Sequence, residues 1–141
     1  MKILAAIDNS SSTAAVLNAI AAQAQPQKTS VRVLHVLQPV SIAVPPQMSP
    51  GYAPELEPFA KPARELLAEA EKTLAASGFK VETMLKKGDV RDSIIDTAKE
   101  WGADLILLGS GAHRFLLGGV AESIVRYAPC SVEIVRTPKP H

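Results

Sequence analysis

Apolar residues along the chain fall alternately into short runs typical of strands and longer stretches with helical spacing. The short runs predict five strands, at residues 2–7, 31–37, 79–85, 105–108 and 132–135. The helical spacing predicts four helices, at residues 14–24, 65–76 and 120–127 and between a capping Asp89 and a terminating Gly102. The run at 105–108 is aliphatic throughout, as in a strand buried on both faces, whereas 79–85 alternates as an edge strand does.

The predicted strands and helices follow one another in the order βαβαβαβαβ. Because parallel strands need crossover connections, this order predicts an α/β fold of Rossmann-like type, with an open five-stranded parallel sheet and right-handed crossovers. The sequence contains no internal repeat and no second block of elements. We therefore expect residues 1–141 to form a single domain.

Prolines interrupt this pattern at one place. Seven of the eleven prolines fall between Pro39 and Pro62, and Gly51 lies among them. Proline removes a backbone donor and fixes φ, so this stretch is expected to be a long loop over the carboxyl end of the sheet. Pro62 can also stand in the first turn of the helix that follows.

Composition and charge limit the classes of function. The net charge is +1 and no block of like charge occurs, which argues against a nucleic-acid partner or a membrane-surface partner. No signal peptide is recognised at the amino terminus, and no apolar run reaches the roughly 18–20 residues of a membrane helix. Cys130 is the single cysteine and cannot form an internal disulfide. These features together predict a cytoplasmic protein.

The candidate chemistry lies where the strands end. Ligands of open parallel sheets bind beyond the carboxyl ends of the strands, where the strand order reverses. If the first strand is central, the turns at Asp8 and Gly109 flank that place. Asp8 can accept hydrogen bonds from a ribose or help to hold a metal ion. Glycines 109, 111, 118 and 119 let the backbone approach a phosphate at a helix start.

Each of these features also has a plain structural interpretation. An aspartate in this position is as often only a helix cap, and glycines after a strand are often only turn residues. His35 is expected to be a buried or half-buried structural histidine, Cys130 a small core residue, and His113 and Arg114 exposed loop charges. The sequence shows no activated nucleophile, metal cluster or catalytic triad, so we predict neither catalysis nor a bound metal.

Several segments resemble the universal stress protein family. Residues 104–110 (DLILLGS), 115–125 (FLLGGVAESIV) and 128–135 (APCSVEIV) resemble its closing half. Residues 3–10 (ILAAIDNS) and 33–36 (VLHV) resemble its opening half, and Gly88-Asp89 with Ile94-Ile95 matches its third crossover. The resemblance therefore covers essentially the whole chain.

The resemblance implies a sheet order of 3-2-1-4-5, ATP or AMP as the ligand in those members that bind nucleotides, and a homodimer. The dimer would form by antiparallel pairing of the last strands, through Val132, Glu133, Ile134 and Val135. The positions that the resemblance assigns to an adenine nucleotide are Ala6, Ile7, Asp8, Val36, Leu108, Gly109, Gly118, Gly119 and Val120. Among these, Asp8 corresponds to a contact with ribose and Val36 to a contact with adenine.

The glycine turn departs from the pattern of ATP-binding members, which have a glycine, two residues, a glycine, nine residues, and a glycine followed by serine or threonine. Gly109 and Gly118 match the first and third glycines, but only eight residues separate them instead of twelve. Gly119 stands where the phosphate-binding hydroxyl belongs. We therefore expect a degenerate site with weak or lost ATP binding, and weak binding of AMP or ADP. The alternative is a universal stress protein fully competent to bind ATP or AMP.

Two other classes of protein with similar folds require residues that this sequence lacks at the corresponding positions. A phosphorelay receiver needs an acidic pair after the first strand and an aspartate after the third. Here Asp8 stands alone, and residues 85–88 (LKKG) contain no aspartate. A flavodoxin-like carrier needs glycine in the loop after the first strand and aromatic residues around a flavin. Residues 8–13 contain no glycine, and the chain has only six aromatic residues.

Overall fold

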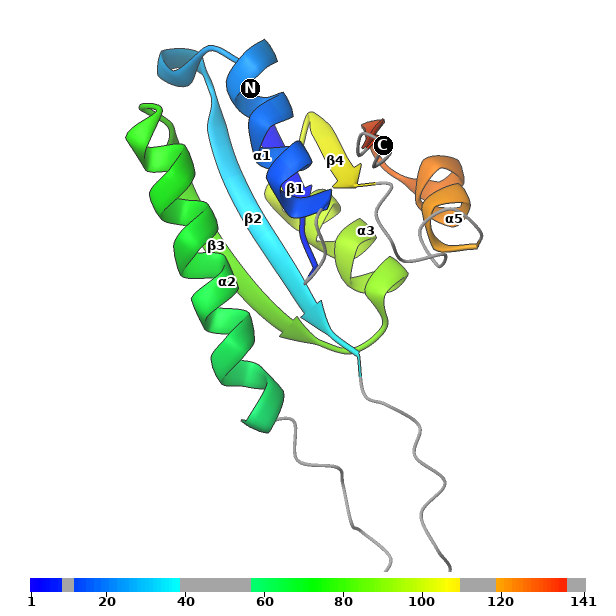
Figure 1. Ribbon diagram of the computed structural model, residues 1–141. Coiled ribbons are helices and arrows are strands. Elements are labelled where there is room, and N and C mark those ends of the chain that lie inside the picture. The colour runs from blue at the N-terminus through cyan, green and yellow to red at the C-terminus, as the bar shows by residue number, and fades with distance from the viewer. Residues whose placement is uncertain (9–11, 39–56, 110–118, 137–141) are drawn as a thin grey trace, which may run out of the picture.

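One parallel sheet organises the computed structural model, which describes residues 1–8, 12–38, 57–109 and 119–136 (Figure 1). Its strands are β1 (Lys2–Ala6), β2 (Ser30–Leu37), β3 (Lys80–Lys87), β4 (Leu105–Gly109) and β5 (Ser131–Val135). They lie in the order β3-β2-β1-β4-β5, and every adjacent pair is parallel. The predicted fold class and strand order are confirmed.

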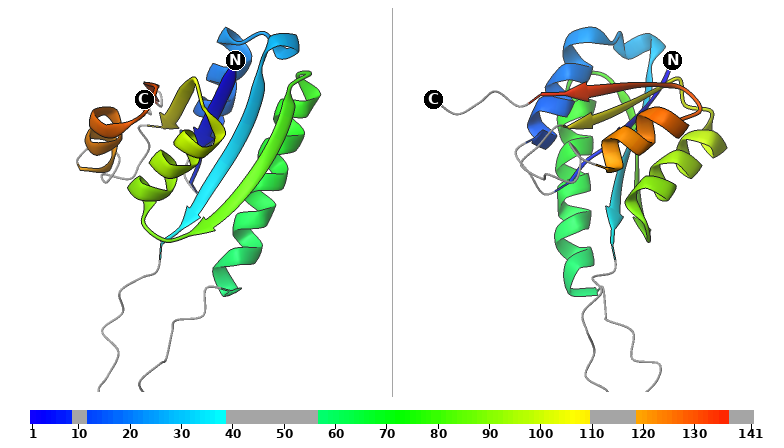
Figure 2. Two further views of the ribbon diagram at one scale, coloured as in Figure 1. Left: turned by 180° about the vertical axis from the view of Figure 1, so that it is seen from behind. Right: turned by 90° about the vertical axis from the view of Figure 1, so that its right-hand side faces the viewer.

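Two pairs of helices cover the two faces of the sheet (Figure 2). The helices are α1 (Ser12–Gln23), α2 (Glu57–Ala76), α3 (Val90–Trp101) and α5 (Val120–Tyr127), and a short 3-10 turn follows α1 at Pro26–Lys28. The helices α1 and α2 pack against one face, where Ile3 and Ala5 of β1 are buried. The helices α3 and α5 pack against the other face, where Leu4 of β1 is buried. The sheet is therefore the middle of three layers.

The helix α2 corrects the prediction for the proline-rich segment. It begins at Glu57, eight residues before the predicted start, so the loop predicted to end at Pro62 ends earlier. A proline in the first turn removes only an amide that has no partner in the helix, but Pro62 lies further in and removes one backbone hydrogen bond. The helix continues past Pro62, and Ala60 and Ala63 on either side of it are buried with Leu37. The rest of the segment, at 39–56, lies outside the described residues.

Other boundaries differ by one to two residues. The helix α1 begins at Ser12 rather than residue 14, and β3 extends to Lys87 rather than residue 85. The last residues of β3 pair with β2 as far as Leu37 and Lys87, although the apolar alternation has ended there. Asp89 caps α3 as predicted, since its carboxylate accepts the N–H of Asp92 at 2.9 Å.

The central pair of strands creates the place for a site. β1 and β4 are adjacent, with Ala6 opposite Leu108. The chain leaves β1 into α1 on one face of the sheet and leaves β4 toward α5 on the other face. The strand order therefore reverses between β1 and β4, and a crevice opens beyond their carboxyl ends.

Candidate functional site

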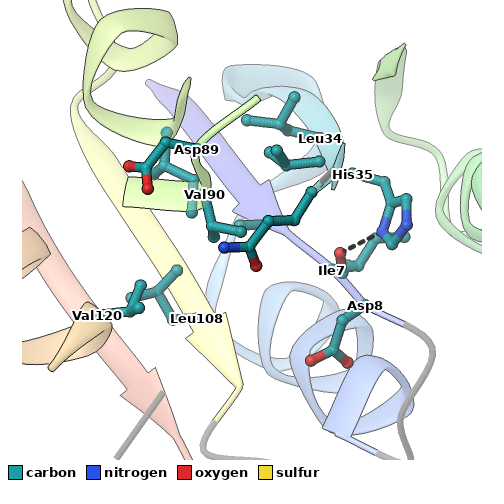
Figure 3. Close-up of a pocket in the computed structure, with 12 residues that line it drawn as sticks. Ile7, Asp8, Leu34, His35, Asp89, Val90, Leu108 and Val120 are labelled. Atoms are coloured by element: carbon teal, nitrogen blue, oxygen red, sulfur yellow. Dashed lines mark hydrogen bonds between the residues drawn. The ribbon is translucent and has the colours of Figure 1, made fainter. Parts of the chain in front are cut away.

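A cavity of about 340 Å³ lies at this crevice. It is bounded by the carboxyl ends of β1, β2 and β4 and by the first residues of α3 and α5 (Figure 3). Its volume falls within the range of roughly 300–1,000 Å³ typical of small-molecule sites. The lining residues are Ala6, Ile7, Asp8, Leu34, His35, Val36, Gln38, Asp89, Val90, Ile94, Leu108 and Val120.

Most of the residues assigned to a nucleotide from the sequence meet in this cavity. Six of them line it, namely Ala6, Ile7, Asp8, Val36, Leu108 and Val120. Gly119 lines a neighbouring hollow, and Gly118 lies outside the described residues. Gly109 is buried at the end of β4 and lines neither space.

The cavity walls are mostly apolar and its polar groups lie toward the rim. Val36 from β2 and Val90 from α3 contribute to the apolar walls. Asp8 just beyond the end of β1 and Asp89 at the start of α3 lie on opposite sides of the cavity (Figure 3). An arrangement of this kind suits a flat apolar ring system that carries hydroxyl groups, because the ring fills the apolar space and carboxylates accept hydrogen bonds from the hydroxyls.

Sequence reasoning missed the contribution of α3. Asp89 was identified only as a helix cap, and Val90 and Ile94 of α3 were not assigned to the site; Leu34 of β2 and Gln38 just after it were not assigned either. The connection from β3 at the sheet edge to β4 near its centre carries α3 across β2 and β1, so its first turn overhangs their carboxyl ends. Gly88-Asp89 at a predicted helix start was the one sequence feature that could have pointed to α3. Whether that helix start lies near the end of β1, however, depends on the order of the strands in the sheet.

A second hollow adjoins the first at the start of α5. Its volume is about 460 Å³, and its lining residues are Asp89, Arg91, Gly119, Val120 and Ser123. Asp89 and Val120 belong to both spaces. Gly119 is the N-cap of α5 and supplies no side-chain capping bond. The amides of the first turn of α5 therefore face a space that could admit an anionic group extending from the cavity.

The turn between β1 and α1, which carries Asp8, is tied to its surroundings through its backbone carbonyls. His35 Nδ1 donates to the carbonyl oxygen of Ile7 at 2.8 Å (Figure 3). Thr13 Oγ1 donates to the carbonyl oxygen of Asp8 at 2.6 Å. His35 is half-buried, which agrees with the structural role predicted for it.

Gly109 has a steric role next to the same turn. A Cβ atom built at Gly109 would lie 2.6 Å from both Cβ and Oγ of Ser12, the first residue of α1. Real side chains do not approach so closely, so glycine lets β4 end against the start of α1. The contact with Ser12 is therefore a reason for glycine at position 109 that does not depend on a bound phosphate.

The family model for the universal stress protein family matches residues 1–136. The chain belongs to this family. A universal stress protein of Bacillus subtilis, YxiE, is 30% identical over 145 aligned positions, which cover 96% of this chain and 98% of the relative.

Solved structures of universal stress proteins share the fold. The UspA protein of Lactobacillus plantarum superposes with a TM-score of 0.75 at 24% identity, covering 96% of this chain and 97% of that one. A universal stress protein of Archaeoglobus fulgidus, solved in complex with dAMP, superposes with a TM-score of 0.72 at 26% identity and the same coverage.

Within the described ranges, no group of three or more His, Cys, Asp or Glu side chains is placed to hold a metal ion. None of the described helices is long and apolar enough to cross a membrane. The expectation that the protein is not an enzyme stays a prediction.

Cys130 is half-buried and packs against the core beneath α3 and α5. Its burial raises the pKa of the thiol, and the negative charge of Asp104 raises that pKa further. A raised folded-state pKa favours the neutral thiol, so any stability that this group contributes is present at neutral pH and is lost as the pH rises through that pKa. The thiolate is the reactive form, so Cys130 should be a poor nucleophile near neutral pH.

We expect iodoacetamide to alkylate Cys130 in the folded protein several-fold more slowly at pH 8 than in the urea-unfolded chain. The difference should shrink as the pH rises, and Asp104→Asn should increase the folded-state rate. Mass spectrometry of timed samples measures these rates. Equal rates in the folded and unfolded protein at pH 8 would contradict the assignment of Cys130 as an unreactive core residue.

Proposed function

We propose that this universal stress protein is a small, cytoplasmic, dimeric stress-response protein with a degenerate adenine-nucleotide site. The site binds AMP weakly and binds ATP weakly or not at all. The observation that carries the proposal is the cavity at the crevice between β1 and β4, which opens beside the bare N-cap Gly119.

The shape and chemistry of the cavity support an adenine nucleoside as the part of the ligand that is bound. The apolar walls around Val36, Val90 and Leu108 suit a purine ring, and the Asp8 carboxylate at the rim suits the hydroxyls of a ribose. The A. fulgidus relative was solved with dAMP, a ligand of this size and type. The second hollow at the start of α5 then adjoins the cavity where a phosphate would leave it.

The phosphate side of the site is where the proposal departs from a competent ATP site. Gly119 has no hydroxyl to donate to a phosphate, and the turn between Gly109 and Gly118 is four residues shorter than the pattern of ATP-binding members. A hydrogen bond to a charged group contributes about 1.5–3 kcal/mol, so the missing hydroxyl alone weakens binding by roughly ten- to a hundredfold.

A competent ATP- or AMP-binding protein is the second candidate, because the amides at the start of α5 still face the hollow. Thermal unfolding with added nucleotide separates the two, since a ligand raises the melting temperature according to its concentration relative to Kd. We expect a clear shift only at millimolar AMP and a smaller shift with ATP. A shift of several degrees at micromolar ATP, or ATP recovered by mass spectrometry from the purified protein, would favour the second candidate.

The edge of the sheet supports the proposed dimer. The strand β5 is an outer strand of the sheet and pairs on one side with β4. Of the four large apolar residues that are exposed in the described part of the chain, Val125 and Tyr127 lie on α5 and Ile134 lies on β5. An unpaired edge with apolar residues beside it is a template for pairing with another chain.

We expect the protein to be a dimer at tens of micromolar, and Ile134→Lys to make it monomeric because a charge at this edge opposes strand pairing. Light scattering measures the mass in solution. Thr83→Lys, at an exposed position on β3, the opposite outer strand of the sheet, is the matched control and should leave the dimer intact. A monomeric wild-type protein would overturn the proposed dimer.

A further inference from the structure

The backbone that presents Asp8 to the cavity is held by side chains from two different elements. β1 ends at Ala6, and the next N–H, that of Ile7, donates to the carbonyl of Leu34 at 2.9 Å. The carbonyl of Ile7 then accepts a hydrogen bond from His35 of β2, and the carbonyl of Asp8 accepts one from Thr13 of α1. Beyond the end of β1, side-chain donors thus take the place of the backbone N–H groups that would pair with these carbonyls in a β-sheet.

Both hydrogen bonds are partly buried. Thr13 is 9% exposed and His35 is half-buried, so neither bond resembles a mobile surface contact. A carbonyl is an acceptor only, so Nδ1 of His35 must carry the proton that it donates to Ile7. Figure 3 shows the imidazole turned toward the Ile7 carbonyl, directly beside Asp8. The two bonds hold successive peptide groups, and Asp8 lies between them.

We propose that His35 and Thr13 are positioning residues of the ligand site, which clamp the carbonyls of Ile7 and Asp8 so that the Asp8 carboxylate is held at the rim of the cavity. The inference rests on the proposed function, because it assigns Asp8 to a bound ligand. The principle is preorganisation: a group fixed before binding does not have to be ordered when the ligand arrives.

Matched substitutions at each position separate the hydrogen bond from side-chain size. His35→Leu removes the donor, whereas His35→Asn places an amide N–H close to the position of Nδ1. Thr13→Val removes the hydroxyl at constant shape, and Thr13→Ser retains it. We expect His35→Leu and Thr13→Val each to weaken AMP binding by about three- to tenfold in calorimetry, with His35→Asn and Thr13→Ser within about twofold of wild type.

A cycle with Asp8→Ala tests whether the two residues act through the carboxylate, since alanine keeps no acceptor at this position. If they position Asp8, then His35→Leu should change AMP affinity by less than about twofold in the Asp8→Ala background. An equal loss in both backgrounds would overturn the proposal, as would unchanged AMP affinity in His35→Leu. Circular dichroism and the melting temperature show that each variant is folded.

Two measurements without ligand keep this inference separable from the proposed function. Nitrogen-15 NMR of the histidine rings should show His35 with its proton on Nδ1, and His35→Leu should increase the backbone mobility of Asp8. If wild-type protein binds no AMP but shows both signals, the proposed function fails and the clamp stands. If the proton lies only on Nε2, or if Asp8 is equally ordered in His35→Leu, the clamp is wrong whatever the protein binds.

Discussion

Gly109→Ala should lower the melting temperature by roughly 3–10 °C, because it costs about 1–3 kcal/mol of overpacking at a site that cannot expand. The new Cβ atom would lie 2.6 Å from Cβ and Oγ of Ser12 and 3.3 Å from its carbonyl oxygen. Ser12 is buried at 2% exposure, and its Cβ is fixed to the backbone of α1, so it cannot swing away. Either β4 or the start of α1 must move. Differential scanning calorimetry of the purified variant measures the change.

A double-mutant cycle attributes this loss to the contact. Ser12→Gly removes both close atoms, so Gly109→Ala should cost clearly less in that background than in wild type. Gly119→Ala is the control, since a Cβ atom there meets none of the described residues within 4 Å and its φ of −89° and ψ of −40° suit any residue. If Gly109→Ala melted like wild type, the close approach of β4 to α1 would be wrong.

Much of the fold follows from local pattern. The alternation of strand and helix along the chain predicted every described strand, because branched aliphatic runs such as 105–108 are buried on both faces of a parallel sheet. The strand order did not follow from that pattern. Crossovers of similar length are compatible with several strand orders, so the pattern alone could not choose among them. The family resemblance implied the order.

The parts that were missed depend on packing between distant segments. Prolines predicted a loop up to Pro62, but α2 begins at Glu57, and Ala60 and Ala63 in its first turns are buried with Leu37 at the end of β2. Likewise, Val90 enters the cavity because α3 crosses the sheet above β1 and β2, and that path is a property of the strand order. The steric need for glycine at position 109 was not predicted either, because it arises from Ser12, a residue 97 positions earlier in the sequence.

Gly119→Ser should convert the degenerate site into a tighter one, with affinity for AMP and ATP increased by roughly ten- to a hundredfold. The position accepts a side chain without backbone strain, because its backbone is right-handed helical, and no atom of the described residues lies within 4 Å of a Cβ built there. A serine there is the N-cap of α5, next to amides that face the second hollow. Its hydroxyl can donate to a phosphate when one is bound and can cap the helix when none is.

Three comparisons make this prediction specific to the phosphate contact, and isothermal titration calorimetry measures each. Gly119→Ala adds the same Cβ atom without the hydroxyl and should bind AMP like wild type. Adenosine has no phosphate, so its affinity should be the same in Gly119→Ser and wild type. A gain for AMP alone would place the first phosphate at the start of α5, because ATP must also fit the shortened turn. If Gly119→Ser gained nothing for either nucleotide, or gained equally for adenosine, the assignment of this helix start to the phosphate would be wrong.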